Sequence, residues 1–440
     1  MNYLVLGLGI TGISTVKTLA KLGYLVYGFD SKISDEKSLP LELKGVDFFP
    51  IFKLEDLQGK DFICIKSPGI PINIEIVKTI ENMGIEIVSD LEMAYRLFGD
   101  KNLIAITGTN GKTTTTMLLN HILNESGKKS IAIGNIGIGM LWEIYTNPDI
   151  DFFVIECSSF QLESISTFRT KVAAITNISP DHIDWHGDFE NYFNAKKKVF
   201  INQEPEDKLI LNMDDEYLKD LLPDIKSKIV TISTKDKTRD FYYEASFIYH
   251  GDRSIIDTHK LNIPGIHNIQ NTLIAAALAS TLGLKDEDIE KACYSFKSVE
   301  HRIEFVRDLE GVKFYNDSKG TNVDSTTKAI ESFNNPIILI AGGYDKKVSF
   351  KEMFLKGKSI IKHLILMGDT AKKMKLEASE AGVKDITIVN NMVEAVDLSK
   401  TIMEKGDIVL LSPACASWGM YKSYIERGEE FKSLVNNLKA

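Results

Sequence analysis

The sequence predicts an α/β protein of three domains, and three observations support this fold class. Short apolar runs alternate with stretches of helical periodicity along most of the 440 residues, as in parallel sheets covered by helices. Two apolar runs end in glycine-rich turns, at residues 7–12 and 108–111, and later runs end in polar loops. Because no linker is rich in Pro or Ser, we expect short hinges between domains spanning 1–97, 98–298 and 299–440.

The composition narrows the class of protein. Apolar residues make up 44% of the chain and charged residues 26%, which is typical of globular domains. The net charge of -9 argues against binding to nucleic acid, and no apolar stretch approaches the ~20 residues that cross a bilayer. Four scattered cysteines indicate reduced thiols, and the first residues lack a secretory pattern. We therefore expect a cytoplasmic protein without nucleic-acid or membrane partners.

The first domain opens with a Rossmann-like pattern. A strand-like run at 3–6 leads into Gly7-Leu8-Gly9-Ile10-Thr11-Gly12, then into helical periodicity at 14–22 and a second strand at 24–29 followed by Asp30. A GxGxxG turn between strand and helix binds a diphosphate with backbone N–H groups and the helix N-terminus. NAD and a UDP-linked sugar both carry a diphosphate, so the turn alone leaves the ligand open.

A second loop of this domain is Ser67-Pro68-Gly69-Ile70, which follows the apolar run 62–65. Ligands on open α/β sheets bind at the carboxyl ends of strands, where this loop is predicted. An ordinary Pro-Gly turn explains the same residues.

The second domain, of the P-loop ATPase type, begins with a phosphate-binding loop. The strand-like run 103–106 breaks into Gly108-Thr109-Asn110-Gly111-Lys112-Thr113-Thr114, and helical spacing follows. The glycines let backbone N–H groups converge on phosphates, the lysine neutralises the outer phosphates, and a threonine hydroxyl can hold Mg²⁺. Two residues separate Gly108 and Gly111 where the usual loop has four, and Ile106 takes the place of the first glycine. This shortened loop predicts binding of a nucleoside triphosphate.

Two further strand ends supply candidate metal ligands. The apolar run 151–155 ends in Glu156, a carboxylate placed as in many NTPases. The next strand-like run leads to Asp181, His182 and Asp184. Because Mg²⁺ prefers oxygen ligands, these residues by themselves favour the two aspartates, with His182 as a polar loop residue.

Two predicted helices of this domain carry polar groups. One contains Lys196, Lys197 and Lys198, a basic cluster that is typical of a solvated helix face. Another begins near Asn268, and Asn271 lies three residues further on, so both amides share one helical face and can read a purine. N-capping by Asn268 is the competing explanation. Between these helices, short strand-like runs suggest additions to the sheet without evident chemistry.

The third domain alternates strands with helices, which predicts a Rossmann-like parallel sheet with right-handed crossovers. The expected strands are 313–315, 337–340, 364–367, 386–389 and 408–411. Polar loops follow three of them, at 316–322, 341–347 and 412–417. Because the carboxyl ends of parallel strands share one edge, we expect these loops to converge.

In this order, the motifs resemble those of the Mur ligases of peptidoglycan synthesis, over nearly the whole chain. The resemblance rests on Gly108 to Thr114, Asp181-His182, Ala195-Lys196, Gly265-Ile266-His267-Asn268, His301-Arg302, Asn316-Asp317-Ser318-Lys319 and Ser412-Pro413-Ala414. Within the family, the segments 156–163, 412–417 and 426–428 are most similar to the member that adds D-glutamate.

The resemblance implies ATP-dependent amide formation through an acyl phosphate. The substrates would be UDP-N-acetylmuramoyl-L-alanine, D-glutamate and ATP, and the cofactor Mg²⁺. The enzyme would act in the cytoplasm as a monomer.

The resemblance also implies a role for each site residue. The UDP-substrate site would comprise Gly9, Thr11, Gly12, Asp30, Ser31, Lys32, Ser67, Gly69, Asn135 and Gln161. The ATP site would comprise Gly108, Thr109, Asn110, Gly111, Lys112, Thr113, Thr114, Asn268, Asn271, Arg302 and Asp317. Mg²⁺ would be held by Thr113, Glu156, His182 and Lys196 as a carbamate, and the catalytic residues would be Lys112, His182 and Lys196. D-glutamate would contact Lys319, Thr321, Lys346, Ser417 and Tyr424.

The match leaves three points open. The resemblance, and not the sequence pattern, selects Lys196 over Lys197 as the carbamate. Lys346 and Lys347 compete for one D-glutamate contact, and Gly419 stands where the family often has Asp.

Three other functions are compatible with the phosphate loop. An amide ligase of the same superfamily for another amino acid, such as a folylpolyglutamate synthase, has no need of the UDP-binding first domain that the intact Gly7 to Gly12 turn predicts. An NAD-binding redox protein with an NTPase domain predicts tight binding of NADH. A nucleotide-switched binding module predicts hydrolysis that is independent of any amino acid.

Overall fold

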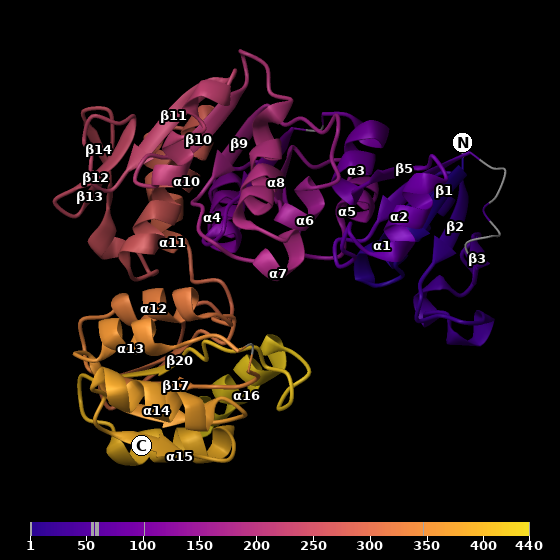
Figure 1. Cartoon of the computed structure of the whole chain (residues 1–440). Helices are drawn as coiled ribbons and strands as arrows, with labels where there is room; N and C mark the ends of the chain where they lie inside the picture. Colours follow the sequence, from indigo (N-terminus) through magenta and orange to yellow (C-terminus); the bar gives the residue numbers. More distant parts are fainter. Residues whose placement is uncertain (1, 54–56, 58–60, 101, 346, 440) are drawn as a thin grey trace. The chain divides into compact units, whose positions relative to one another are not determined.

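The computed structural model describes residues 2–53, 57, 61–100, 102–345 and 347–439 (Figure 1). Over these residues three sheets form, of five, nine and six strands, in agreement with the predicted fold class. The chain divides into two compact units. Unit 1, Met1–His259 with Gln270–Tyr294, holds the first two sheets, and unit 2, Lys260–Ile269 with Ser295–Ala440, holds the third. The expected domain boundaries near residues 97 and 298 stay predictions.

The first sheet is parallel, in the order β3-β2-β1-β4-β5. Its strands are β1 (Asn2–Leu6), β2 (Leu25–Phe29), β3 (Phe49–Ile51), β4 (Phe62–Lys66) and β5 (Glu86–Val88), with helices α1 (Ile10–Lys21), α2 (Glu75–Asn82) and α3 (Asp90–Phe98). Successive residues of β1 face opposite sides, so Tyr3 and Val5 pack with α1 and α3, whereas Leu4 and Leu6 pack with α2. The first glycine turn therefore follows the central strand of a sheet that is covered on both faces.

The second sheet has the order β14-β13-β12-β11-β10-β9-β6-β8-β7. Its strands are β6 (Leu103–Thr107), β7 (Ser130–Gly134), β8 (Phe152–Glu156), β9 (Val172–Ile175), β10 (Lys208–Asn212), β11 (Lys228–Ser233), β12 (Phe241–Glu244), β13 (Phe247–His250) and β14 (Arg253–Asp257). The helices of this region are α4 (Lys112–Glu125), α5 (Met140–Thr146), α6 (Ser159–Leu162), α7 (Ile183–His186), α8 (Phe189–Ile201), α9 (Glu216–Lys219), α10 (Ile266–Thr281) and α11 (Asp286–Ser295). Strands β6 to β12 pair in parallel, and β13 and β14 extend the sheet beyond β12 as antiparallel additions.

The third sheet has the order β15-β16-β20-β17-β18-β19. Its strands are β15 (Glu304–Leu309), β16 (Val312–Asn316), β17 (Ile337–Ala341), β18 (Ile361–Leu366), β19 (Ile386–Ile388) and β20 (Ile408–Leu411), with helices α12 (Val323–Glu331), α13 (Lys351–Gly357), α14 (Ala371–Ala381), α15 (Met392–Ile402) and α16 (Tyr424–Asn437). The expectation of an entirely parallel sheet is wrong at β15, which pairs antiparallel with β16. Glu310 and Gly311 link these strands with φ of 55° and 83°, and a two-residue turn with two positive φ angles suits the twist of a hairpin.

Helices cover both faces of the third sheet (Figure 1). Ile337 and Leu339 of β17 pack in one apolar cluster with α12, α13 and α14, whereas Ile338 and Ile340 pack in another with α15 and α16. This three-layer arrangement leaves the carboxyl ends of the parallel strands for polar loops.

Within unit 1, a buried carboxylate joins the first two sheets. Glu92 of α3 accepts hydrogen bonds from the backbone N–H groups of Ser166, Thr167 and Phe168, at 2.9, 3.0 and 2.8 Å. Arg96, one turn further along α3, donates to the same carboxylate at 2.8 Å. Burial opposes the charge on Glu92, but the hydrogen bonds outweigh it and lower the pKa to about 2. An ionised carboxylate thus fixes α3 against the chain after α6.

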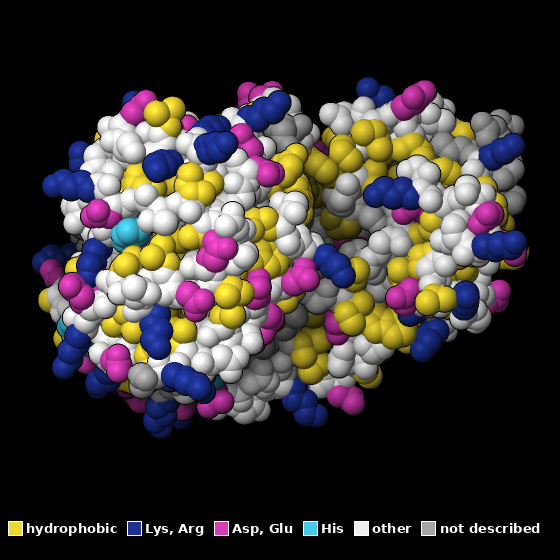
Figure 2. Space-filling model, turned by 90° about the horizontal axis from the view of Figure 1, so that it is seen from below, with side chains coloured by type: hydrophobic (Ala, Val, Ile, Leu, Met, Phe, Trp, Pro, Cys, Tyr) yellow, Lys and Arg dark blue, Asp and Glu magenta, His cyan; other side chains and the backbone are white. Residues whose placement is uncertain are grey.

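The surface carries mixed charge. Lys and Arg side chains are interspersed with Asp and Glu over the face shown in Figure 2. Across the described ranges of the chain, none of the helices has the length and apolar character needed to span a bilayer.

Candidate functional site

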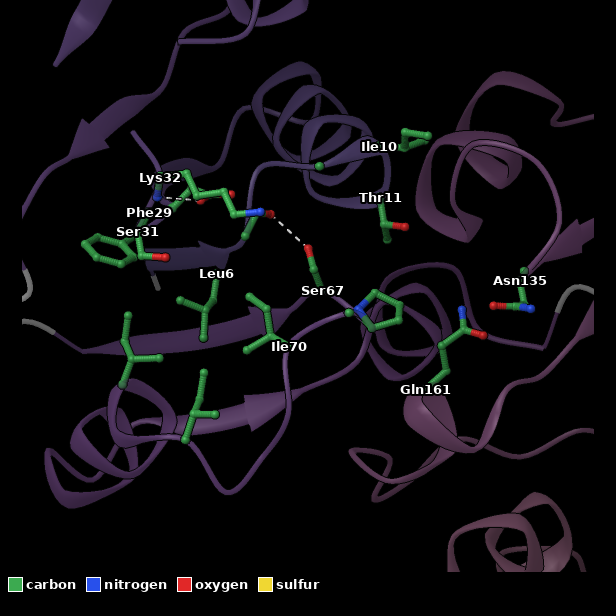
Figure 3. A pocket seen from close by; sticks show the side chains of 18 of the residues that line it. Leu6, Ile10, Thr11, Phe29, Ser31, Lys32, Ser67, Ile70, Asn135 and Gln161 are labelled. Carbon is green, nitrogen blue, oxygen red and sulfur yellow. Dashed lines mark hydrogen bonds between the residues drawn. The ribbon is translucent and has the colours of Figure 1, made fainter. Parts of the chain in front are cut away.

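A cavity of about 510 Å³ lies beside the first glycine turn, within unit 1 (Figure 3). Its lining includes Gly9, Thr11, Asp30, Ser31, Lys32, Ser67, Gly69, Asn135 and Gln161. In Figure 3, Thr11 and Ser67 lie on one part of the wall, and Asn135 and Gln161 enter from segments of the second sheet. The structure thus gathers around one space the residues that the sequence assigns to the UDP substrate, and Gly12 lies behind them in α1.

Hydrogen bonds hold the glycine turn in place. The backbone N–H of Leu8 donates to Asp30 Oδ2, and the Ser67 hydroxyl donates to the Gly7 carbonyl, both at 2.8 Å. A Cβ added at Gly12 would stand 1.8 Å from that carbonyl, whereas one added at Gly9 meets no described heavy atom within 4 Å. Gly12 therefore serves the close packing of helix on strand, and Gly9 leaves room for a ligand at the N-terminus of α1.

The polar side chains that reach the cavity from the second sheet are oriented by neighbours. The Asn135 side chain donates to Glu156 Oε1 at 2.8 Å. Gln161 accepts a hydrogen bond from the Ser158 N–H and donates to Asp90 Oδ1, both at 3.2 Å. Fixed amides of this kind recognise polar ligands at low entropic cost.

The phosphate loop connects β6 to α4, as predicted. Gly108 and Gly111 have φ of 145° and 84°. A Cβ at Gly108 would lie 2.0 Å from Thr176 Oγ1, and one at Gly111 would lie 2.2 Å from Asn271 Oδ1. Both positions therefore require glycine, for the backbone angle and for the space. The shortened loop is a tight turn pressed against β9 and α10.

Two lysines converge on this loop. Lys112 Nζ donates to the carbonyls of Gly108 and Thr109, each at 2.8 Å, and Lys196 Nζ donates to the Gly108 carbonyl at 2.6 Å. Lys196 is only 2% exposed, so the expectation that its basic cluster is a solvated face is wrong at this residue. Lys197 instead forms an ion pair with Asp224 near the surface. Of the three adjacent lysines, α8 thus buries Lys196 at the phosphate loop.

Burial changes the chemistry of Lys196. Desolvation, and then the positive charge of Lys112, lower the pKa of Lys196 well below its ordinary value. Its amine also lies over the ring of Tyr192, 4.7 Å from the centroid. A neutral, buried amine is a nucleophile, whereas an exposed ammonium is not.

The candidate metal ligands differ in how far they are buried. Glu156 is buried at the end of β8, and Thr113 is buried in the first turn of α4. The His182 side chain is 48% exposed, and its ring contacts Phe160 at 4.9 Å between centroids. Asp181 Oδ1 accepts a hydrogen bond from the His182 N–H at 2.9 Å, and the Asp184 side chain lies outside the described part. The described side chains include no group of three or more His, Cys, Asp or Glu arranged for one metal ion.

The two asparagines of α10 have distinct surroundings. Asn271 accepts a hydrogen bond from Thr115 Oγ1 at 3.3 Å, which places it at the phosphate loop. Asn268 is the third residue of α10, and its amide donates to the Pro264 carbonyl at 2.6 Å. The N-capping explanation for Asn268 is therefore wrong, because the helix begins two residues earlier.

In unit 2 the predicted polar loops converge. Ser412 Oγ donates to Asp317 Oδ2 at 2.6 Å, and Tyr344 forms an antiparallel bridge with Ala416. Burial raises the pKa of Asp317 to about 7, against the hydrogen bond from Ser412 and the nearby charge of Arg302. The expectation that these loops meet at one sheet edge is confirmed.

A smaller cavity of about 240 Å³ opens between these loops. Thr321, Ser417 and Tyr424 line it, so three residues predicted for D-glutamate share one space. Lys319 Nζ lies 5.4 Å from the centre of the Tyr424 ring. Lys346 lies outside the described residues, and the neighbouring Lys347 is exposed.

Sequence reasoning missed two groups beside these sites. Tyr192 lies 2.8 Å, between hydroxyl oxygens, from Thr109 of the phosphate loop. It precedes Lys196 by one helical turn, a spacing that indicates a shared face and was available in the sequence. Arg427 belongs to the segment 426–428 that carries part of the resemblance, but its burial beneath the loops of unit 2 was not predicted.

Known proteins match this chain over nearly its whole length. Family models match residues 1–89 (Mur ligase MurD-like, N-terminal domain), 106–279 (Mur ligase middle domain) and 301–415 (Mur ligase, glutamate ligase domain). A UDP-N-acetylmuramoylalanine--D-glutamate ligase of Caldanaerobacter subterraneus subsp. tengcongensis is 42% identical, with 99% of this chain and 98% of the relative covered. One of Clostridioides difficile is 43% identical, with 100% and 99% covered.

Solved structures show the same fold. UDP-N-acetylmuramate-alanine ligase MurC from Thermotoga maritima superposes with a TM-score of 0.61 at 20% identity, covering 100% of both chains. MurF ligase from Thermotoga maritima in complex with ADP gives 0.60 at 15% identity, covering 94% of this chain and 89% of the other. With all three domains matched in order and full-length relatives above 40% identity, the chain belongs to the Mur ligase family.

Proposed function

We propose that this chain is an ATP-dependent ligase that joins D-glutamate to UDP-N-acetylmuramoyl-L-alanine in the synthesis of peptidoglycan precursors. The observation that carries the proposal is the full-length match, at 42–43% identity, to relatives named for that reaction. The two cavities and the phosphate loop supply the kinds of site that such a reaction needs.

The first step is activation of a carboxylate. The terminal carboxylate of the UDP-sugar-alanine attacks the γ-phosphorus of ATP, forming an acyl phosphate and releasing ADP. Two anions must approach each other, so Lys112 offsets their repulsion, and the N-terminus of α4 and the loop N–H groups hold the phosphates. Lys112 already lies on the loop, with its amine on the Gly108 and Thr109 carbonyls.

The second step forms the amide. The amine of D-glutamate attacks the acyl carbon, the C–O bond to phosphate breaks, inorganic phosphate leaves, and the nitrogen loses a proton. The dianionic amino acid requires cations and hydroxyls, which Lys319, Thr321 and Ser417 supply beside the small cavity, with Tyr424 as a wall. Lys346 is the remaining proposed contact.

The cofactor is Mg²⁺, for which Thr113, Glu156, His182 and Lys196 as a carbamate are the proposed ligands. It would neutralise charge on the phosphates. Glu156 offers a buried carboxylate, and the lowered pKa of Lys196 favours the neutral amine, which can add CO₂ with loss of a proton and so yield an anionic oxygen ligand. Both features fit a hard cation.

We also propose where the UDP substrate and the rest of ATP bind. The 510 Å³ cavity takes the UDP substrate, with the diphosphate at Gly9 and Thr11 and the uracil end near Asp30, Ser31 and Lys32. Asn268, Asn271, Arg302 and Asp317 are the proposed further contacts of ATP. We propose a monomer that acts in the cytoplasm.

The test is phosphate release with ATP and UDP-N-acetylmuramoyl-L-alanine across a panel of D-glutamate, L-glutamate, D-alanine, L-lysine and diaminopimelate. D-glutamate should be the sole strong activator. Equal activation by another amino acid would reassign the reaction within the family. UDP should raise the thermal unfolding midpoint and NADH should not, and the reverse result would favour a redox protein.

A further inference from the structure

Arg427 of α16 is a charged side chain buried in unit 2, with 1% of its surface exposed. Its guanidinium donates to Ser318 Oγ at 3.0 Å, to the Ser318 carbonyl at 2.8 Å and to the Cys415 carbonyl at 3.1 Å. These three acceptors are neutral oxygens from two loops.

The same guanidinium reaches a third segment and the start of its own helix. The Ser318 hydroxyl that accepts from Arg427 also donates to the Tyr424 carbonyl at 2.8 Å. A Cβ added to Gly343, in the loop after β17, would stand 3.4 Å from Arg427 Nη1. One side chain thus lies where the loops after β16, β17 and β20 meet the N-terminus of α16.

The loops after β16 and β20 and the start of α16 line the 240 Å³ cavity. Thr321 comes from the loop after β16, Ser417 and Trp418 from the loop after β20, and Ser423 and Tyr424 from the start of α16. Arg427 itself is absent from the described lining and stands behind it. The planar fork of an arginine fixes acceptors in a geometry that a lysine cannot reproduce.

No carboxylate among the described residues pairs with Arg427 within 4.0 Å. Burial lowers its pKa to about 10, so the side chain remains a cation at neutral pH. Asp317 attracts Arg427 from beyond ion-pair distance. A buried cation without a direct ion pair is still costly to the fold, and an anion entering the adjacent cavity would reduce that cost.

We propose that Arg427 is a positioning residue that fixes the walls of the D-glutamate cavity and biases it toward anions. The proposal rests on the proposed function, which assigns this cavity to D-glutamate. Arg427 acts through Ser318 and Cys415, the residues it holds.

Arg307 of β15 offers a matched control. It also donates to backbone carbonyls, those of Val435, Asn436 and Leu438 at the other end of α16. Removing Arg307 disturbs the same helix and the same kind of bond, but its acceptors lie at the far end of α16. The acceptors of Arg427 adjoin the cavity lining, because Cys415 precedes Ala416 and Ser318 donates to the Tyr424 carbonyl.

The experiment compares Arg427→Lys, Arg427→Met and Arg307→Met with the unaltered chain in steady-state turnover. In Arg427→Lys the KM for D-glutamate should rise at least about tenfold, because sub-ångström displacement of a site residue has effects of this size. Arg427→Met should raise it further, while the KM values for ATP and the UDP substrate stay within about twofold in both variants. Arg307→Met should leave all three KM values unchanged.

Trapping of the acyl phosphate with hydroxylamine separates the possible failures. The unaltered chain and the Arg427 variants should form hydroxamate equally without D-glutamate. If the unaltered chain forms none, the proposed function fails. If it does, and the Arg427 variants keep the KM for D-glutamate or raise all KM values together, the role of Arg427 is overturned. Should Arg427→Met not fold, Arg427→Lys and the milder Ser318→Ala carry the test.

Discussion

The two glycine turns of unit 1 each connect a strand to a helix, but they differ in the side chains that surround them. Each follows a strand that has a parallel partner on both sides and precedes a helix. The first turn opens onto a cavity, and Ile10, at the start of its helix, is 71% exposed. The second is covered by Tyr192 and α10, and two lysine amines lie on its Gly108 carbonyl.

The difference separates holding a phosphate from transferring one. Backbone N–H groups and a helix N-terminus suffice to bind a diphosphate that does not react. Transfer of a phosphoryl group to a carboxylate requires concentrated positive charge in a place shielded from water.

The largest effect is expected at Lys112. Lys112→Ala should lower the rate of ADP formation by roughly 10³-fold, because the charge that offsets repulsion between anions is lost. The measurement is ADP release with saturating UDP substrate, and the exposed Lys128→Ala is the control. Retained substrate-dependent turnover in Lys112→Ala would show that the second turn works without its lysine.

Lys196 should have the next largest effect. Lys196→Ala should reduce turnover by about 10²-fold, in line with the loss of a residue that supports a metal site. Removal of CO₂ should weaken the unaltered chain, and acetate or formate should partly restore Lys196→Ala. The neighbouring Lys197→Ala, which keeps Lys196, should retain near-normal turnover and should be weakened by removal of CO₂ in the same way as the unaltered chain. If removal of CO₂ leaves the unaltered chain unaffected and carboxylic acids do not restore Lys196→Ala, Lys196 is a plain lysine.

A pair of glycine substitutions divides the first turn into packing and binding. In Gly12→Ala the new Cβ meets the Gly7 carbonyl at 1.8 Å, so the turn must open. We expect a destabilisation of about 1–3 kcal/mol without ligand. Gly9→Ala should keep the unfolding midpoint of the free protein, because its Cβ has space, but weaken UDP binding by roughly tenfold. Calorimetry of both variants checks this, and equal midpoints would refute it.

The smallest effect on activity is expected at Glu92, which joins the sheets that bear the two turns. Glu92→Gln should destabilise unit 1 by about 2 kcal/mol at neutral pH, because hydrogen bonds to a charged group are lost. The folded pKa of about 2 lies below the ordinary value of 4.5, so this contribution exists above pH 4.5 and is lost as the pH falls toward 2. Unfolding curves of both proteins should converge over that range while kcat at neutral pH changes little. A constant difference across the range would contradict the assignment.

The glycine turns were predictable because their chemistry is local. Gly108, Gly111 and Lys112 lie within one turn of chain, and their spacing alone indicates a phosphate loop between strand and helix. The apolar runs likewise predicted β1, β6 and β17, since strands buried on both faces are continuous in hydrophobicity.

What the sequence could not predict depends on distant packing. Lys196 and Lys197 are equivalent until the helix face is known, and only burial against Gly108 separates them. Arg427 is one of many charged residues until its loops, more than a hundred residues away for Ser318, close around it. The antiparallel β15 was missed because its inward and outward residues do not alternate clearly in polarity.

The hairpin of β15 and β16 has a consequence for how unit 2 folds. Its strands are joined by two residues, so they can pair within about 1–10 μs, before distant segments meet. Asp317 follows β16 directly, whereas its partner Ser412 lies 95 residues further along the chain. Closing such a long loop is slower and costs more entropy than closing the two-residue hairpin. The hairpin therefore closes at a low cost in loop entropy, whereas the contact between Asp317 and Ser412 requires a much longer loop to close.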